Sequence, residues 1–117
     1  MILADTSDWI EMLEGRHPAL AEQLLQEQVL LHPWVLGELA LGNLTDRAAN
    51  LGQLSLLSAA PVIEEERVLA LIERHRLHGG GLGWVDCQLL ASAKAMQANL
   101  WTHDKALKRA WERIFRA

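Results

Sequence analysis

Short apolar runs alternate along the chain with longer stretches in which apolar residues recur at helical spacing. The short runs predict buried strands, because each is bounded by turn-forming or polar residues. They cover residues 1–4, 29–31, 61–63 and 100–103, and a possible edge strand covers 113–115. The longer stretches predict helices over residues 7–15, 17–28, 32–42, 45–57, 64–77, 84–98 and 105–111. This alternation predicts an α/β fold with a central parallel sheet of four to five strands and right-handed crossovers.

Acidic side chains stand at four landmarks of this pattern. Asp5 ends the first predicted strand, Glu38 lies inside the helix over 32–42, Asp86 opens the helix over 84–98, and Asp104 ends the last apolar run. The ends of neighbouring parallel strands meet at one edge of the sheet, where ligands of α/β folds bind. Carboxylates gathered there need a cation, and oxygen ligands suit Mg²⁺ or Mn²⁺. We expect Asp5 and Asp86 to bind the metal directly, and Glu38 and Asp104 to bind it directly or through water. An aspartate at the end of a strand is by itself also typical of a turn or a helix cap, and Glu38 alone would be an exposed helix residue.

The bulk composition fits one domain over residues 1–117. The net charge is −4, but it is unevenly spread: residues 1–66 carry 11 acids and two bases, and residues 67–117 carry 4 acids and nine bases. Such asymmetry favours a charged partner, although solvated helix faces would also explain it. Cys87 is the single cysteine, which excludes an internal disulfide and favours a reducing compartment. We find no signal peptide and no apolar run of membrane-spanning length, so we expect a cytoplasmic protein that does not contact a membrane.

Other motifs were weighed and set aside. The glycine-rich segment 79–83 lacks the spacing of a dinucleotide-binding loop, and the chain has neither a phosphate-loop lysine motif nor zinc-finger spacing of Cys and His. On a strand, His103 should point to the face opposite its neighbour Asp104. Most of the five tryptophans are expected to be core or interface residues rather than base-stacking platforms.

Basic residues follow the last predicted strand. They could hold the phosphates of a nucleic acid beside Asp104, or they could form an ordinary solvated helix. The group consists of Lys105, Lys108, Arg109, Arg113 and Arg116.

The segments MILADTSDWI, VLGELALG, GLGWVDCQLLASA and LWTHDKAL together resemble the PIN domain of bacterial VapC-type toxins. The resemblance extends from residue 1 to about residue 110. It implies a three-layer α/β/α fold and a Mg²⁺- or Mn²⁺-dependent endoribonuclease with RNA as its substrate. It also implies a VapB-like antitoxin as a partner, and a homodimer.

The same resemblance assigns a role to each matching residue. It makes Asp5, Glu38, Asp86 and Asp104 the catalytic and metal-binding acids. Thr102 would orient a carboxylate or a water, and Thr6 and Ser7 would brace Asp5.

Two other functions stay open. Asp5 could be the nucleophile of a phosphatase that resembles the haloacid-dehalogenase-like enzymes. That family has a second aspartate two residues after the first, where this chain has Ser7. Alternatively, the chain could be a non-catalytic module that binds RNA or a basic peptide. Metal-independent binding without hydrolysis would indicate this last function.

Overall fold

The computed structural model describes residues 1–116, with side chains through residue 115. Three parallel strands form its sheet: β1 (Ile2–Ala4), β2 (Val29–Leu30) and β3 (Asn99–Trp101). The order is β2-β1-β3, so β1 is the central strand, with Ile2 opposite both Val29 and Asn99. All three residues of β1 are buried, as an apolar run between two neighbours requires.

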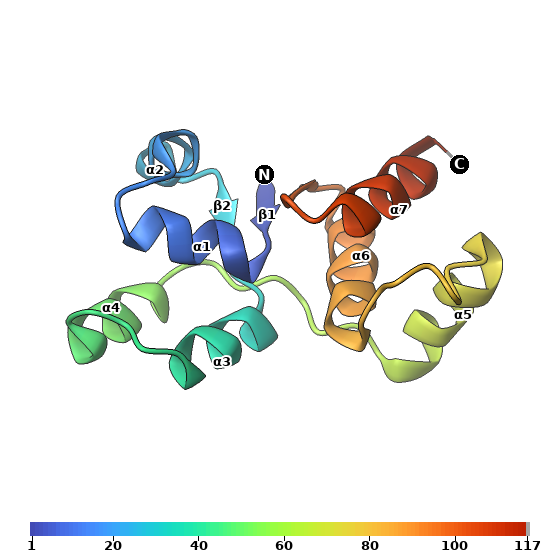
Figure 1. The fold of residues 1–117 in the computed structure, drawn as a ribbon, viewed down its shortest axis with the longest axis horizontal. Coiled ribbons are helices and arrows are strands. Elements are labelled where there is room, and N and C mark those ends of the chain that lie inside the picture. The colour runs from blue at the N-terminus through green and yellow to red at the C-terminus, as the bar shows by residue number, and fades with distance from the viewer. Residues whose placement is uncertain (117) are drawn as a thin grey trace.

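Seven helices surround the sheet (Figure 1). In the view of Figure 1, α1 to α4 gather on one side of β1 and α5 to α7 on the other. This arrangement confirms the α/β class. The helices are α1 (Thr6–Leu13), α2 (Pro18–Leu25), α3 (Pro33–Leu41), α4 (Arg47–Leu54), α5 (Glu65–His75), α6 (Trp84–Met96) and α7 (Lys105–Arg116).

Two of the predicted strands are absent from the described residues, so the predicted count of four to five strands was wrong. Residues 61–63 belong to neither a strand nor a helix, and the only pairing nearby among the described residues is an isolated parallel bridge between Leu31 and Ala59. The Ile63 backbone is bound by a side chain instead: Gln88 accepts from the Ile63 N–H at 2.7 Å and donates to the Ile63 carbonyl at 3.1 Å. Residues 113–115 belong to α7, in which Leu107, Ala110 and Ile114 are buried at helical spacing.

The core lies where the helices meet the sheet. Leu3 of β1, Trp9 of α1, and Leu89 and Leu90 of α6 are fully buried. Full burial of a leucine contributes about 1.5–3 kcal/mol to stability. By contrast, Trp84 is 42% exposed, so the tryptophans differ in their surroundings. Within residues 1–116, no helix is both long enough and apolar enough to cross a membrane.

Candidate active site

Asp5 stands at the carboxyl end of the central strand, where the chain turns into α1. Its backbone N–H donates to the Trp101 carbonyl at 2.9 Å, which holds the end of β1 against β3. Its side chain caps α1, since Oδ1 accepts from the Thr6 N–H at 2.8 Å. Ser7 is exposed, and no cap on α1 comes from it. The first acid is therefore fixed by the strand on one side and by the helix amide on the other.

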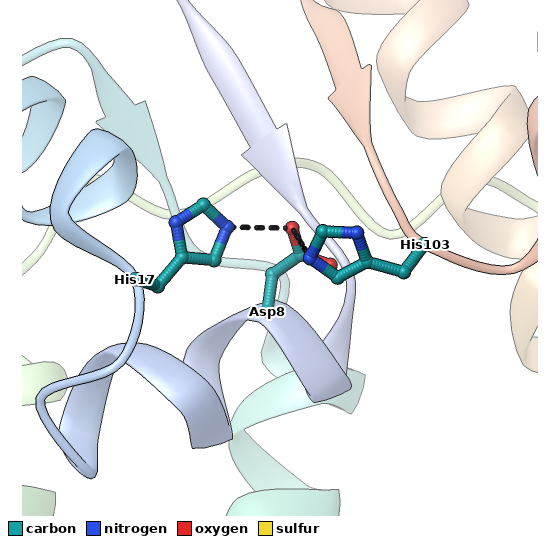
Figure 2. Close-up of side chains that lie close together, drawn as sticks. All are labelled: Asp8, His17 and His103. Atoms are coloured by element: carbon teal, nitrogen blue, oxygen red, sulfur yellow. Dashed lines mark hydrogen bonds and ion pairs between the residues drawn. The ribbon is translucent and has the colours of Figure 1, made fainter.

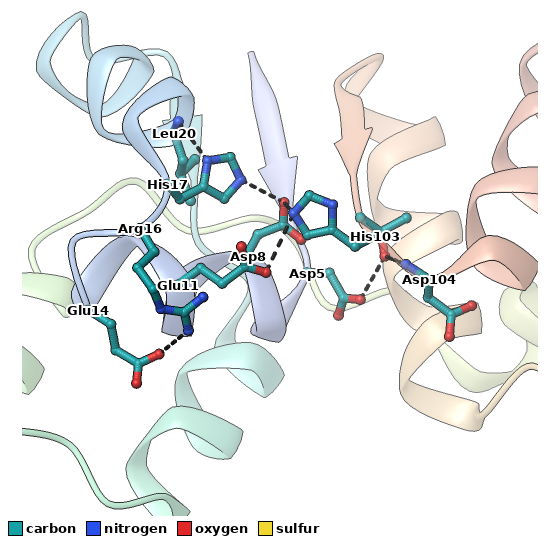
Figure 3. Close-up of polar contacts among 10 residues, drawn as sticks. Asp5, Asp8, Glu11, Glu14, Arg16, His17, Leu20, His103 and Asp104 are labelled. Carbon is teal, nitrogen blue, oxygen red and sulfur yellow. Dashed lines mark hydrogen bonds and ion pairs between the residues drawn. The ribbon is translucent and has the colours of Figure 1, made fainter.

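Thr102 links Asp5 to Asp104 across the end of β3. Its hydroxyl donates to Asp5 Oδ2 at 2.9 Å and accepts from the Asp104 N–H at 3.0 Å. Asp104 in turn caps α7, because its Oδ1 accepts from the Leu107 N–H at 2.8 Å. Figure 3 shows Asp5 and Asp104 on either side of this link.

Thr6 makes the corresponding link to Glu38. The Thr6 hydroxyl donates to Glu38 Oε1 at 2.6 Å, which joins the first turn of α1 to the exposed middle of α3. Thus Asp5, Glu38 and Asp104, which are far apart in the sequence, are connected through Thr6 and Thr102.

Asp86 is fixed by the start of α6. Its Oδ2 accepts from the Gly83 N–H at 2.9 Å, across the first turn of the helix. The loop that leads there needs glycine at Gly79 and Gly81, because their φ angles are +71° and +83°.

The surroundings of Asp5 disfavour its charged form. Burial raises the pKa of Asp5 above its usual value, and the charges of Asp86 and Asp8 raise the pKa further, while the hydrogen bonds from Thr102 and Thr6 lower it. Among the described residues, no Lys, Arg or His forms an ion pair with Asp5, Asp86 or the two other predicted acids.

The four acids do not form a closed ligand shell by themselves. Across residues 1–115, one group of three His, Cys, Asp or Glu has its possible ligand atoms all within 4.8 Å of one another, and it is Asp8, His17 and His103 (Figure 2). No three of the predicted carboxylates meet as closely. A cation among them would therefore need water to complete its coordination, which is usual for Mg²⁺.

Sequence reasoning missed this Asp-His-His group. Asp8 is 2% exposed, and His17 Nε2 lies 3.0 Å from its Oδ2. His103 lies 3.7 Å from the same oxygen, because β3 ends at Trp101 and the alternation expected of a strand does not reach position 103. The sequence contained one sign of this group. Asp8 lies four residues before Met12, on the same face of α1, and Met12 packs against the core, so Asp8 is a charged residue at a core-facing position.

The basic side chains of α7 divide between two hollows. Lys108 lines the pocket that also contains Asp8, His17 and His103, whereas Arg109 and Arg113 line a groove shared with residues 76–82. Lys105 is exposed at the start of α7. The side chain of Arg116 lies outside the described part of the chain.

Two comparisons with known proteins agree on the family. A family model described as PIN domain matches residues 2–112. Two relatives, both called Ribonuclease VapC32 and found in the Oshkosh and H37Rv strains of Mycobacterium tuberculosis, are each 46% identical to this chain. The matches span 111 residues, which is 94% of this chain and 90% of each relative.

Proposed function

Because this chain belongs to the PIN domain family, and within it to the VapC-type ribonucleases, we propose that it is an RNA-cleaving toxin of a toxin–antitoxin pair. The resemblance seen in its sequence motifs is thereby confirmed. One observation of the structure supports the activity above the others: Asp5, at the end of the central strand, is tied to Asp104 through Thr102, and its neighbour Thr6 binds Glu38. This arrangement puts oxygen ligands at the edge where α/β folds bind their ligands.

The residues at this edge suit Mg²⁺ or Mn²⁺. The donors are carboxylate oxygens. Burial and, to a smaller extent, the charge of Asp86 raise the pKa of Asp5, and no basic side chain among the described residues forms an ion pair with it. Asp5 and Asp86 would hold the ion, with Glu38 and Asp104 reaching it directly or through water. When bound, such an ion lowers the pKa of a water and stabilises charge that develops on a phosphodiester.

The side chains of the protein then position the reactants. Thr102 holds Asp5 Oδ2 in place, which keeps one carboxylate oxygen directed toward Asp104 rather than free to rotate. Lys108 and Arg109 are exposed on α7, the helix that Asp104 caps, and would bind phosphates of the RNA on either side of the cleaved bond. Glu38, exposed on α3, can accept a proton from an incoming water.

Cleavage of total cellular RNA by the purified protein tests this proposal. We expect discrete cuts in the RNA when Mg²⁺ or Mn²⁺ is present. These cuts should disappear when EDTA is added, and the Asp86→Asn variant should not make them. The matched control is Glu73→Gln, which removes one exposed carboxylate of α5 and should cut normally. Cutting by Asp86→Asn at the normal rate would reject the metal-binding role of Asp86, and tight RNA binding without cuts by the folded protein would favour the non-catalytic module.

The partners follow from the same proposal. A VapB-like antitoxin with an Arg- or Lys-bearing segment would neutralise the acids around Asp5, because they have no basic partner among the described residues. A homodimer would cover part of the exposed apolar surface, since Leu25, Leu41 and Leu56 are 84–90% exposed. Light scattering of the protein should then give twice the chain mass, and a monomer mass at all concentrations would refute the homodimer.

A further inference from the structure

A small pocket next to Asp5 contains ligands of a different kind from the acids described above. Its volume is about 230 Å³. The side chains that matter for its chemistry are Asp8, His17, Trp101, His103 and Lys108. Two imidazoles and one carboxylate point toward one another here, from α1, from the turn before α2 and from the connection between β3 and α7 (Figure 2).

The distances in this group suit a tetrahedral ion. With ligand bonds of about 2.0–2.2 Å, the ligand atoms of a tetrahedral Zn²⁺ lie roughly 3.3–3.5 Å apart. Asp8 Oδ2 lies 3.0 Å from His17 Nε2 and 3.7 Å from His103 Nε2. Both distances are within a few tenths of an ångström of the tetrahedral value, and all three ligand atoms lie within 4.8 Å of one another. The ring of His17 is also held in place, because it stacks on Trp101 with a centroid distance of 6.0 Å and an interplanar angle of 6°.

A second observation points to a ligand independently of these distances. Asp8 is 2% exposed, and its Oδ1 is buried without any hydrogen-bond partner among the described residues. A buried carboxylate oxygen that accepts nothing is costly, and most such atoms in proteins are bonded. The histidines engage only the other oxygen, Oδ2, so an ion that Asp8 binds through both carboxylate oxygens would supply the partner that Oδ1 lacks.

We propose that Asp8, His17 and His103 form a second cation site, which takes Zn²⁺ or a similar transition metal. Two nitrogens and one oxygen suit such ions, whereas Mg²⁺ prefers oxygen alone. Three protein ligands leave a fourth position open, as in sites that bind water or an exchangeable ligand. His103 is 60% exposed, so this position opens toward solvent and gives the ion a way in. Glu11 Oε1 lies 3.5 Å from the same His103 Nε2, so this contact would be broken when an ion binds that nitrogen.

Metal binding at His17 has a distinctive consequence for α2. His17 Nδ1 accepts from the Leu20 N–H at 3.2 Å, so in the neutral imidazole the proton is on Nε2 and is donated to Asp8. An ion bound at Nε2 moves that proton to Nδ1, and the Leu20 amide loses its acceptor. The Leu20 amide therefore reports on the site directly.

The site also connects three parts of the chain that are separate in sequence. Asp8 belongs to α1, His17 precedes α2, and His103 lies between Thr102 and Asp104. An ion shared by them fixes the β3–α7 connection against α1. We therefore expect Zn²⁺ to raise the melting temperature of the folded protein, because it binds the native arrangement and not the unfolded chain.

Titration of the full-length protein with Co²⁺, followed by displacement with Zn²⁺, tests the proposal without RNA. The Asp86→Asn variant is used beside the unaltered protein, so that binding by the acidic site is distinguished. We expect one equivalent of Co²⁺ with the intense visible absorption of tetrahedral coordination in both proteins. The Leu20 amide resonance should move on Zn²⁺ addition.

Two ligand variants and one control decide the outcome. His103→Gln changes an exposed side chain and should leave the fold intact, yet it should weaken Co²⁺ binding by more than the roughly 10–100-fold that loss of an outer partner causes. His17→Gln should do the same, and His78→Gln, which alters an exposed histidine of the glycine-rich loop, should change nothing. Three results would overturn the proposal. The first is an unchanged Co²⁺ affinity in both ligand variants, and the second is the absence of Co²⁺ binding by the unaltered protein. The third is Co²⁺ binding that is lost in Asp5→Asn but kept in His103→Gln.

Discussion

Replacing Thr102 with valine removes one hydroxyl from the centre of the candidate active site and keeps the shape of the side chain. That hydroxyl donates to Asp5 Oδ2 at 2.9 Å and accepts from the Asp104 N–H at 3.0 Å. A hydrogen bond to a charged group contributes roughly 1.5–3 kcal/mol. Because a tenfold change in rate corresponds to about 1.4 kcal/mol, loss of this contribution in the transition state should lower kcat/KM roughly 10- to 150-fold.

The pH dependence of the variant should change as well. The Thr102 hydrogen bond lowers the pKa of Asp5 and so opposes the effect of burial, which raises it. Without the hydroxyl the pKa of Asp5 rises further, and more of the carboxyl is protonated at a given pH. Since the ionised form binds the cation, the acid limb of the profile of kcat/KM against pH should move to higher pH in Thr102→Val.

Initial rates of cleavage of one mapped RNA, measured across pH with saturating Mg²⁺ or Mn²⁺, give both quantities. Thr102→Ser keeps the hydroxyl and should restore most of the rate and the normal acid limb. Thr45→Val makes the same chemical change at an exposed position before α4 and should behave like the unaltered protein. A Thr102→Val enzyme with a normal rate and an unmoved acid limb would refute the positioning role.

Three further changes test the site, the substrate surface and the fold. Asp5→Asn should abolish cleavage. In metal-free buffer it should also raise the melting temperature at neutral pH but not at acidic pH. Because folding raises the pKa of Asp5, the native state of the unaltered protein loses stability as pH rises through that pKa, and the asparagine avoids this loss. An equal shift at both pH values would contradict this. Lys108→Gln should make the plot of log Kobs, the observed RNA-binding constant, against log salt concentration less steep by about 0.7, as expected for the loss of one phosphate contact with a single strand. Lys94→Gln on α6 should leave the slope unchanged. Gln88→Met should lower the free energy of unfolding in urea by about 2–5 kcal/mol, because it leaves the buried N–H and carbonyl of Ile63 unpaired, and a loss below about 1 kcal/mol would show that water replaces both bonds.

The fold illustrates what apolar periodicity can and cannot reveal. The runs at 1–4, 29–31 and 100–103 correspond to the strands Ile2–Ala4, Val29–Leu30 and Asn99–Trp101. The central strand β1, which lies between two neighbours, is buried throughout. The run at 61–63 looks the same in the sequence, and Ile63 is indeed buried. The pattern reports burial but does not reveal what binds the backbone, and here the partner is the side chain of Gln88 from α6. Sequence spacing gives no sign of that pairing.

The candidate site shows the same division. The end of a buried strand places Asp5 at the sheet edge, and a helix start after a glycine-rich loop places Asp86 opposite, so both positions were readable from the sequence. Spacing alone did not reveal the contact between Thr102 and Asp5, which are 97 residues apart, although the family resemblance implied that Thr102 orients a carboxylate or a water. The role of Thr6 was only partly anticipated: its amide binds Asp5, but its hydroxyl binds Glu38.

The two proposed cation sites would share one short piece of backbone, and this sharing would couple them. Thr102 binds Asp5 through its hydroxyl, and the next residue, His103, faces Asp8. An ion that draws His103 toward Asp8 moves the residue that holds the Asp5 carboxylate, so Zn²⁺ in the second site changes the affinity of the acidic site for Mn²⁺. Because such coupling is a free energy between two binding sites, it is reciprocal: Mn²⁺ must change the affinity for Zn²⁺ by the same factor. Titrations of each ion in the presence of the other measure both factors. An apparent affinity that keeps falling as the second ion is added, without reaching a limit, would mean that the ions compete for the same ligands rather than occupy separate sites.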